Sequence, residues 1–254
     1  MIDLSNKKGL IVGVANDRSV AWGCAKVLHA AGAKLAITYG RDKTREYVEP
    51  LLEQVPADIF TQMDITNTEH RSAVADKIKS KWGSLDFLIH SVAFAPADDL
   101  HGRVVDASRD GFLLSTEISC YSLISLIKTC EPLMTKGGSI LTMTYYGSQK
   151  VMPMYGIMGP MKALLEAIVK YTAAELGKEK IRVNAISPGP LQTRAASGIS
   201  DFDKLLKKCH DVAPLCSQLS TEDVGNLAAF LVSDLSKNIT GDVHYVDCGY
   251  KVMG

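Results

Sequence analysis

Short apolar runs alternate with longer segments of helical periodicity along the whole chain, and this alternation restricts the possible folds more than any other feature. Continuous runs of Val, Ile and Leu are typical of strands buried on both faces, which occur in parallel sheets covered by helices. The expected strands are 8–14, 34–39, 58–63, 85–90, 139–144, 181–186 and 242–246. The expected helices are 19–31, 44–54, 69–82, 111–134, 155–176 and 221–232. The pattern predicts an α/β protein: a single doubly wound domain over residues 1–254, with a seven-stranded parallel sheet and helices on both faces.

The composition restricts the class of protein further. The 254 residues include 28 Lys and Arg against 28 Asp and Glu, and a neutral chain without basic runs disfavours nucleic-acid binding and a polybasic membrane patch. No apolar stretch approaches the ~18 residues of a transmembrane helix, and the N-terminal sequence lacks the layout of a signal peptide. The six cysteines form no Cys-x-x-Cys or zinc-type cluster, so we expect reduced thiols, no metal and a cytoplasmic protein.

The turn between the first strand and the first helix contains candidate cofactor contacts. Gly13 ends the strand, and Ser19 and Val20 stand at the start of the helix. A glycine lets the backbone approach a pyrophosphate, and the free N–H groups of a helix N-terminus bind it. Gly13 and Gly23 do not have the plain G-x-G-x-x-G spacing, so the glycines alone are weak evidence. Ser19 either donates its hydroxyl to a phosphate or simply caps the helix.

The ends of the second and third strands bear on which nicotinamide cofactor is bound. An acidic residue at the tip of the second strand would bind the ribose hydroxyls, and a basic residue would accept a 2′-phosphate. The sequence there has Gly40 followed by Arg41, without an acidic residue at the tip, and it leaves the choice between NADH and NADPH open. Asp64, at the end of the third strand, either accepts from the adenine amino group or closes a turn.

Tyr155 and Lys162 form the candidate catalytic pair. On one continuous helix, residues at this spacing differ by only about 20° around the axis and lie about 10 Å apart along it, so the two side chains would share a face. A lysine there can hold ribose hydroxyls, and its charge favours hydrogen-bond donation by a nearby phenol. Such pairs are common by chance, and the position after the fifth strand of a dinucleotide-binding fold is what makes this one significant.

The motifs together resemble those of the short-chain dehydrogenases/reductases, and among them the bacterial enoyl-[acyl-carrier-protein] reductases. The matching segments are Gly13…Ser19-x-Ala21-x-Gly23, 90–95, Tyr145…Tyr155…Lys162, 182–190, 195–199 and 222–226, which span nearly the whole chain in order. Most short-chain reductases have a closer Tyr–Lys spacing and an upstream serine, whose place Tyr145 and its neighbours take here. The resemblance implies a Rossmann-type fold and the reduction of trans-2-enoyl-acyl-carrier-protein thioesters by NAD(P)H in type II fatty-acid biosynthesis.

The resemblance also assigns roles to particular residues. Tyr155 would stabilise the enolate, Lys162 would hold the nicotinamide ribose, and Tyr145 would position the substrate as a third catalytic residue, next to a substrate contact at Ala95. Between Tyr145 and Tyr146, only the resemblance favours Tyr145 as the one facing the site. The implied cofactor contacts are Gly13, Ser19, Val20, Gly40, Asp64, Ile65, Val92, Lys162, Leu191, Gln192, Thr193, Arg194 and Ala195. The cofactor more often used by this branch is NADH, with NADPH not excluded.

The Tyr–Lys spacing separates two reactions of the same fold. A tyrosine one turn further from the lysine lies away from the reacting nicotinamide carbon, so it suits the carbonyl of a conjugated enoyl thioester better than a ketone that is reduced directly. The alternative is a 3-oxoacyl or other carbonyl reductase of the same superfamily. A protein that senses the nucleotide without chemistry is disfavoured because Tyr155 and Lys162 are both present.

Three further expectations concern the surface of the molecule. Residues 191–210 are expected to form a flap that covers the acyl chain of the substrate. Beside it, Lys204, Lys207 and Lys208 either dock the acidic acyl carrier protein or form a solvated helix face. The expected helix 111–134 carries apolar residues on more than one face, so it must bury a second side. Together with the resemblance, this predicts a homotetramer.

Overall fold

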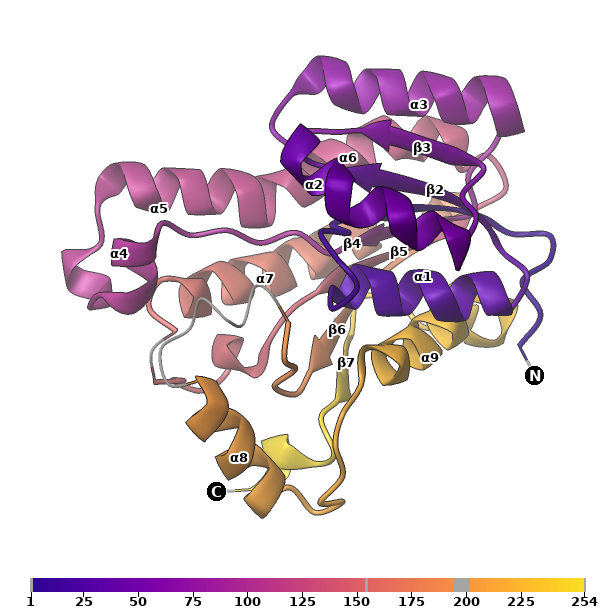
Figure 1. The fold of residues 1–254 in the computed structure, drawn as a ribbon. Coiled ribbons are helices and arrows are strands. Elements are labelled where there is room, and N and C mark those ends of the chain that lie inside the picture. The colour runs from indigo at the N-terminus through magenta and orange to yellow at the C-terminus, as the bar shows by residue number, and fades with distance from the viewer. Residues whose placement is uncertain (1, 154, 194–201, 254) are drawn as a thin grey trace.

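The computed structural model describes residues 2–153, 155–193 and 202–253. Within them, seven strands form one parallel sheet in the order β3-β2-β1-β4-β5-β6-β7. The strands are β1 (Lys8–Val12), β2 (Lys34–Tyr39), β3 (Ile59–Gln62), β4 (Phe87–His90), β5 (Gly138–Met143), β6 (Ile181–Pro188) and β7 (Val243–Val246). The strand order reverses at β1, which pairs with β2 on one side and with β4 on the other (Figure 1). Ligands of such sheets bind at this switch point, beyond the carboxyl ends of the strands.

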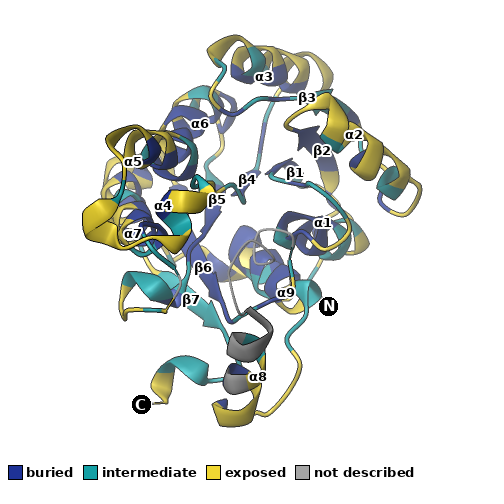
Figure 2. Ribbon diagram, turned by 60° about the vertical axis from the view of Figure 1, so that its left-hand side comes forward, coloured by how far each residue is buried: buried dark blue, intermediate teal, exposed yellow. Residues whose placement is uncertain are grey.

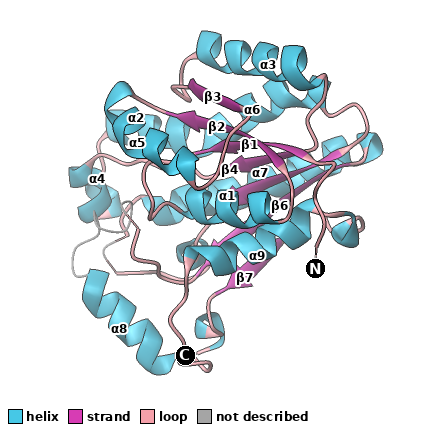
Figure 3. Ribbon diagram, turned by 45° about the vertical axis from the view of Figure 1, so that its right-hand side comes forward, coloured by secondary structure: helices cyan, strands magenta, loops and turns pink. Residues whose placement is uncertain are grey.

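Helices cover both faces of the sheet, so the predicted fold class is confirmed (Figure 3). They are α1 (Val20–Ala30), α2 (Asp42–Val48), α3 (Thr68–Trp82), α4 (Ala97–His101), α5 (Arg109–Thr116), α6 (Ser122–Cys130), α7 (Met158–Leu176), α8 (Phe202–Val212) and α9 (Thr221–Val232). One apolar core lies between the sheet and α3, α6 and α7. The other lies between the sheet and α1 and α9. Figure 2 shows buried strands between helices whose outer faces are exposed.

Two of the predicted helices are divided into segments of different winding. The expected helix 44–54 is α2 followed by a 3₁₀ turn, Glu49–Glu53. Pro50 is the second residue of this turn, and a proline cannot continue the α-helical ladder. The expected helix 111–134 contains a π-helical turn, Glu117–Tyr121, between α5 and α6. Such turns occur often at functional sites. In the part of the chain that the structure describes, none of the helices is long and apolar enough to cross a membrane.

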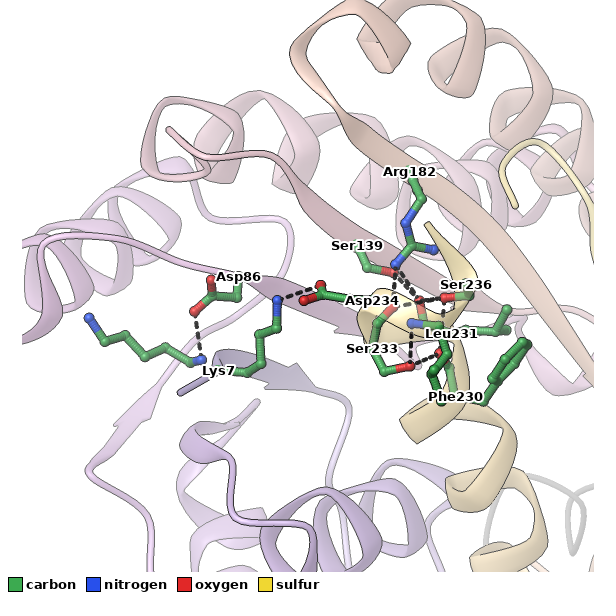
Figure 4. A network of polar contacts seen from close by, with 11 residues as sticks. Lys7, Asp86, Ser139, Arg182, Phe230, Leu231, Ser233, Asp234 and Ser236 are labelled. Atoms are coloured by element: carbon green, nitrogen blue, oxygen red, sulfur yellow. Dashed lines mark hydrogen bonds and ion pairs between the residues drawn. The ribbon is translucent and has the colours of Figure 1, made fainter. Parts of the chain in front are cut away.

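A polar network joins the C-terminal end of α9 to the amino ends of β5 and β6 (Figure 4). The guanidinium of Arg182 donates to the carbonyl oxygens of Leu231, at 2.7 Å, and Ser233, at 3.3 Å. The hydroxyl of Ser139 donates to the same Leu231 oxygen at 2.8 Å. The last carbonyls of a helix lack partners within it, so these donors satisfy them. The network thereby fixes α9 at the amino ends of the strands, and the switch-point crevice lies at their opposite, carboxyl ends.

Candidate active site

Tyr155 lies in the turn before α7 and not in the helix. The helix begins at Met158, and Gly156 has a φ of +43°, a conformation that interrupts a helix and favours glycine. A Cβ atom at Gly156 would lie 2.3 Å from the carbonyl oxygen of Leu100 in α4, so only glycine allows the turn to pass so close. The prediction of a helix starting at residue 155, with Tyr155 and Lys162 on one of its faces, is therefore wrong.

The two candidate tyrosines nevertheless meet at the carboxyl end of β5. The rings of Tyr145 and Tyr155 pack edge to face, with their centroids 5.0 Å apart. Gly147 makes room for this contact, because a Cβ atom there would lie 2.7 Å from the Tyr155 ring. Burial raises the pKa of both phenols, so both stay protonated at neutral pH. The structure therefore places two hydrogen-bond donors side by side.

The hydroxyl of Tyr145 is buried and has no hydrogen-bond partner among the described residues. Cys209 of α8, Tyr250 and Tyr155 interact with it electrostatically and so surround this end of the ring. A buried donor without a partner costs about 1–3 kcal/mol, and an acceptor oxygen on a ligand would remove that cost. The unpaired hydroxyl of Tyr145 therefore indicates a position where an oxygen atom of a ligand could accept a hydrogen bond.

Tyr146, the neighbouring residue, faces another part of the molecule. Its hydroxyl donates to the carbonyl oxygen of Lys251 at 3.0 Å, and the residue is buried. The sequence reasoning distinguished Tyr145 from Tyr146 only by the family resemblance. The structure now gives a physical distinction, since Tyr145 contacts Tyr155 and Tyr146 is held by the C-terminal segment.

Lys162 lies in the first turns of α7 and is almost fully buried. Its ammonium donates to the carbonyl oxygen of Met143, at the end of β5, over 2.8 Å. Burial lowers the pKa of Lys162 to about 8, against the opposing effects of Cys120 and Glu166. An ammonium has three donors, so two remain for the hydroxyls of a ribose. The contacts of Lys162 within the described residues do not include Tyr155.

The turn after β1 is shaped for a close approach of another group. Gly13 has a φ of +106°, and a Cβ atom there would lie 2.0 Å from the carbonyl oxygen of Ser91, so only glycine fits. Ser19 is the residue before α1, but its side chain bonds no N–H group of that helix. Its hydroxyl oxygen accepts from the N–H groups of Ala15, at 3.0 Å, and Asn16, at 3.1 Å. Ser19 therefore stabilises the turn instead of capping the helix in the ordinary way.

Asp64 closes a turn after β3, as one of its two interpretations predicted. Its carboxylate accepts from the N–H group of Thr66 at 3.0 Å and from its hydroxyl at 2.8 Å. Burial acts to raise the pKa of Asp64, but the bonds from Thr66 and the nearby charges of His70 and Arg41 outweigh it and lower the pKa. Arg41 and Asp64 follow the carboxyl ends of β2 and β3, which are parallel neighbours, so a basic and an acidic group share the end of the sheet where adenosine is expected.

The remaining predicted contacts differ in how far they are exposed. Gly40 and Gln192 are exposed, Val20, Val92, Ala95 and Thr193 are half-buried, and Ile65 and Leu191 are buried. The segment after β4 that contains Val92 and Ala95 is held by Ser119 of the π-helical turn, whose hydroxyl accepts from the N–H group of Phe94 and donates to its carbonyl oxygen. Arg194 and Ala195 lie outside the described residues.

Two open cavities of about 440 Å³ each border this region. One lies between the start of α1 and residues 218–222, with Gln192 and Arg18 in its wall. The other lies between α4 and α5 and is lined partly by aspartates. Neither of the two is lined by Tyr145, Tyr155 or Lys162. Among the described residues, no group of three His, Cys, Asp or Glu side chains could hold a metal.

A buried carboxylate behind the site was missed by the sequence reasoning. Glu166 in α7 accepts hydrogen bonds from the hydroxyls of Thr144, at 2.7 Å, and Ser148, at 2.6 Å. The available signal was its position four residues after Lys162, which places both side chains on one face of the helix. Nothing in the sequence pattern indicated that the loop after β5 would fold back onto this carboxylate.

Comparison with known proteins gives consistent matches over the full chain. Residues 13–251 match the family described as Enoyl-(Acyl carrier protein) reductase. The enoyl-[acyl-carrier-protein] reductase [NADH] FabI of Rickettsia felis is 49% identical over 99% of this chain and 96% of its own. The structure of the Bacillus cereus enoyl-acyl carrier protein reductase with NADP+ and indole naphthyridinone has a TM-score of 0.97 and 44% identity, covering 100% of both chains. The Anaplasma phagocytophilum reductase in complex with NAD has a TM-score of 0.95 and 47% identity, covering 99% of this chain and 97% of that one.

The doubly wound sheet, with Lys162 and two tyrosines near the carboxyl end of β5, defines an oxidoreductase of the short-chain dehydrogenase/reductase class. Within that class, the chain belongs to the enoyl-(acyl-carrier-protein) reductase family. The family that the sequence motifs predicted is thereby confirmed.

Proposed function

We propose that this protein reduces the carbon–carbon double bond of trans-2-enoyl thioesters on acyl carrier protein, with NADH, in type II fatty-acid biosynthesis. The observation that carries the proposal is the unpaired, buried hydroxyl of Tyr145 in contact with Tyr155, because two adjacent phenol donors suit a carbonyl oxygen that gains charge. The relative from Rickettsia felis is named for NADH. One related structure contains NADP+, so NADPH stays an alternative.

The residues present fit a dinucleotide. Gly13 leaves room for a close approach, the N-terminus of α1 lies beside it, and Lys162 has donors to spare. We assign the cofactor contacts to the predicted residues: Gly13, Ser19, Val20, Gly40, Asp64, Ile65, Val92, Lys162, Leu191, Gln192, Thr193, Arg194 and Ala195. When bound, NADH supplies the hydride that adds to the β-carbon of the double bond.

The protein's own residues act on the charge that then develops. As the β-carbon accepts the hydride, negative charge builds on the thioester oxygen as an enolate. A proton from solvent then adds to the α-carbon, which gives the saturated thioester. Tyr155 donates a hydrogen bond to that oxygen, a contribution worth about 10²–10³-fold in rate for one such donor. Tyr145 positions the thioester beside Ala95, and Lys162 holds the ribose hydroxyls. Because Lys162 already donates to Met143, its ammonium is fixed before the cofactor arrives.

The partners follow from the substrate and from the surface. Acyl carrier protein delivers the enoyl chain. The flap over that chain is assigned to residues 191–210 of the single domain, of which 194–201 lie outside the described residues. Exposed apolar side chains on α5 and α6, among them Phe112, Leu113 and Ile124, support assembly into a homotetramer. The cytoplasmic location rests on the sequence, whose cysteines form no disulfide among the described residues.

The test compares two substrates and one variant. NADH oxidation is followed with a trans-2-enoyl thioester and with a 3-oxoacyl thioester; we expect turnover of the first. Tyr155→Phe should lower that turnover about 10²-fold and leave the dissociation constant of NADH, measured by fluorescence, almost unchanged. Turnover of only the 3-oxoacyl thioester would establish the carbonyl reductase instead. An unchanged rate in Tyr155→Phe would remove this residue from the mechanism.

A further inference from the structure

Glu166 is a buried carboxylate that the proposed chemistry does not use. It is 8% exposed and lies one helical turn beyond Lys162 on the same face of α7. One of its oxygens, Oε1, accepts hydrogen bonds from both Thr144 and Ser148. A buried charge is costly unless it is hydrogen-bonded or paired. Its presence directly behind the site therefore calls for a function there.

The two hydrogen bonds to Glu166 bracket Tyr145. Thr144 directly precedes Tyr145 and Ser148 follows it by three residues, so both ends of the segment 144–148 are tied to one oxygen atom of α7. The hydroxyl of Tyr145 has no partner of its own among the described residues. The position of that ring therefore depends on its backbone and on its packing against Tyr155, and Glu166 fixes the backbone part.

Glu166 also sets the charge around Lys162. The other titratable groups that interact with Lys162 are Cys120 in the π-helical turn and His90 at the end of β4. Burial raises the pKa of Cys120 to about 11 and lowers the pKa of His90 to about 3, so both are neutral at physiological pH. Tyr245 of β7 interacts with Glu166, and burial raises the pKa of its phenol as well. Cys120 can raise the pKa of Lys162 only as a thiolate, which its own raised pKa prevents near neutral pH. Among these described groups, the negative charge next to Lys162 at that pH therefore comes from Glu166.

We propose that Glu166 is a positioning residue with two effects: it holds the segment 144–148 so that Tyr145 meets the substrate, and it keeps Lys162 a cation. The proposal rests on the proposed function, because it assigns Tyr145 and Lys162 their roles in enoyl reduction. The two effects use different properties of the carboxylate. Holding the segment needs an acceptor oxygen, whereas keeping Lys162 charged needs the negative charge.

Two sets of variants separate these effects. Glu166→Gln keeps an acceptor oxygen of the same size and removes the charge. The double variant Thr144→Val and Ser148→Ala keeps the charge and removes both donors. Glu175→Gln, which removes an exposed carboxylate from the same helix, is the matched control. The ionisation of Lys162 is measured in the ligand-free protein by NMR of ¹³C-labelled lysine, with Lys162→Met to assign the signal, and KM and kcat are measured with a trans-2-enoyl thioester.

We expect Glu166→Gln to lower the titration midpoint of Lys162 by about one pH unit and Glu175→Gln to leave it unchanged. The double variant should raise KM for the enoyl thioester about fivefold, as for the loss of ~1 kcal/mol of hydrogen bonding, with the Lys162 midpoint and NADH affinity unchanged. An unchanged midpoint in Glu166→Gln, or an unchanged KM in the double variant, would overturn the proposal.

If Glu166→Gln does not fold, Glu166→Asp serves in its place, because the side chain is shorter by one methylene group and holds the charge farther from Lys162. The titration of Lys162 needs no turnover. It therefore tests the effect of Glu166 on the charge of Lys162 even if the protein does not reduce enoyl thioesters.

Discussion

His90 is a buried histidine whose two ring nitrogens are both hydrogen-bonded. Nε2 lies 2.8 Å from the hydroxyl of Ser122, which itself donates to the carbonyl oxygen of Ile118. Ser122 must therefore accept from Nε2–H. Burial together with the charge of Lys162 lowers the pKa of His90 to about 3, so the imidazole is neutral at physiological pH. In that neutral form Nδ1 accepts a hydrogen bond from the hydroxyl of Thr142, 2.9 Å away.

The neutral state of His90 makes stability depend on pH. Because the unfolded chain takes up a proton near pH 6.5 and the folded protein does not, acidification below 6.5 favours unfolding until the folded pKa of about 3 is reached. We expect His90 to contribute a loss of about 2 kcal/mol between pH 7 and pH 5. Urea unfolding at the two pH values should show this loss in the wild type and a correspondingly smaller one in His90→Gln. The exposed His101 supplies the control, His101→Gln, and equal pH dependence in all three proteins would contradict the assignment.

The sequence identifies the candidate catalytic residues, but it does not predict their contacts. Tyr145, Tyr155 and Lys162 were found because their order and spacing match a family pattern. The hydrogen bonds of Glu166 with Thr144 and Ser148 join residues from a loop and a helix, and no local pattern records such a contact. Predicting them requires knowing how the loop after β5 lies on α7, which depends on the tertiary packing.

Helices α1 and α9 cross at two glycines. A Cβ atom at Gly23 would lie 2.4 Å from both Cβ and the carbonyl oxygen of Thr221, and one at Gly225 would lie 2.7 Å from the carbonyl oxygen of Gly23. In the sequence, Gly23 is a candidate glycine of the cofactor-binding turn. The structure gives it a packing role, since it lets α9 approach the helix whose N-terminus faces that turn.

Gly23→Ala should therefore destabilise the protein. The extra methyl group must push the two helices apart, and overpacking of this kind costs about 1–3 kcal/mol. Gly177→Ala is the control, because nothing lies within 4 Å of its Cβ position and its φ of −62° suits alanine. The control should be neutral or stabilising by up to ~1 kcal/mol. Equal unfolding free energies for the two variants would show that the helices do not depend on this close crossing.

At the level of elements, the strands and long helices were predictable and the interruptions were not. Buried runs such as Lys34–Tyr39 show the predicted bounds, because apolar continuity and flanking turn residues define them locally. The start of α7 was misplaced by three residues, since the positive φ of Gly156 serves a contact with Leu100 of a distant segment. The π-helical turn Glu117–Tyr121 was likewise not predicted, because the apolar periodicity of the sequence indicates a helix without showing a local change in its winding.

The molecule as a whole leaves large apolar side chains exposed on one pair of helices. Phe112 and Leu113 on α5, Tyr121 in the π-helical turn and Ile124 on α6 are each at least 40% exposed. Large apolar side chains exposed together along neighbouring helical segments are typical of a protein–protein interface. This exposure agrees with the proposed homotetramer, in which the same face of another subunit would cover these side chains.

A charge on this face should therefore break the assembly. Tyr121→Asp and Ile124→Asp would bury an unpaired carboxylate in the interface, which is strongly unfavourable. Sedimentation velocity should show a tetramer for the wild type and smaller species for both variants. Leu235→Asp, at an exposed leucine of the turn after α9, should sediment like the wild type. A monomeric wild type at the assay concentration would contradict the proposal.

In the proposed function Tyr155 and Lys162 act on one bound nicotinamide, although the turn at Gly156 separates them. A crystal structure of the protein with NAD+ and a trans-2-enoyl thioester would show whether they do. We expect the Tyr155 hydroxyl within about 3 Å of the thioester oxygen and the Lys162 ammonium within about 3 Å of the ribose hydroxyls. A Tyr155 ring that packs into the core and faces away from the nicotinamide would contradict this expectation.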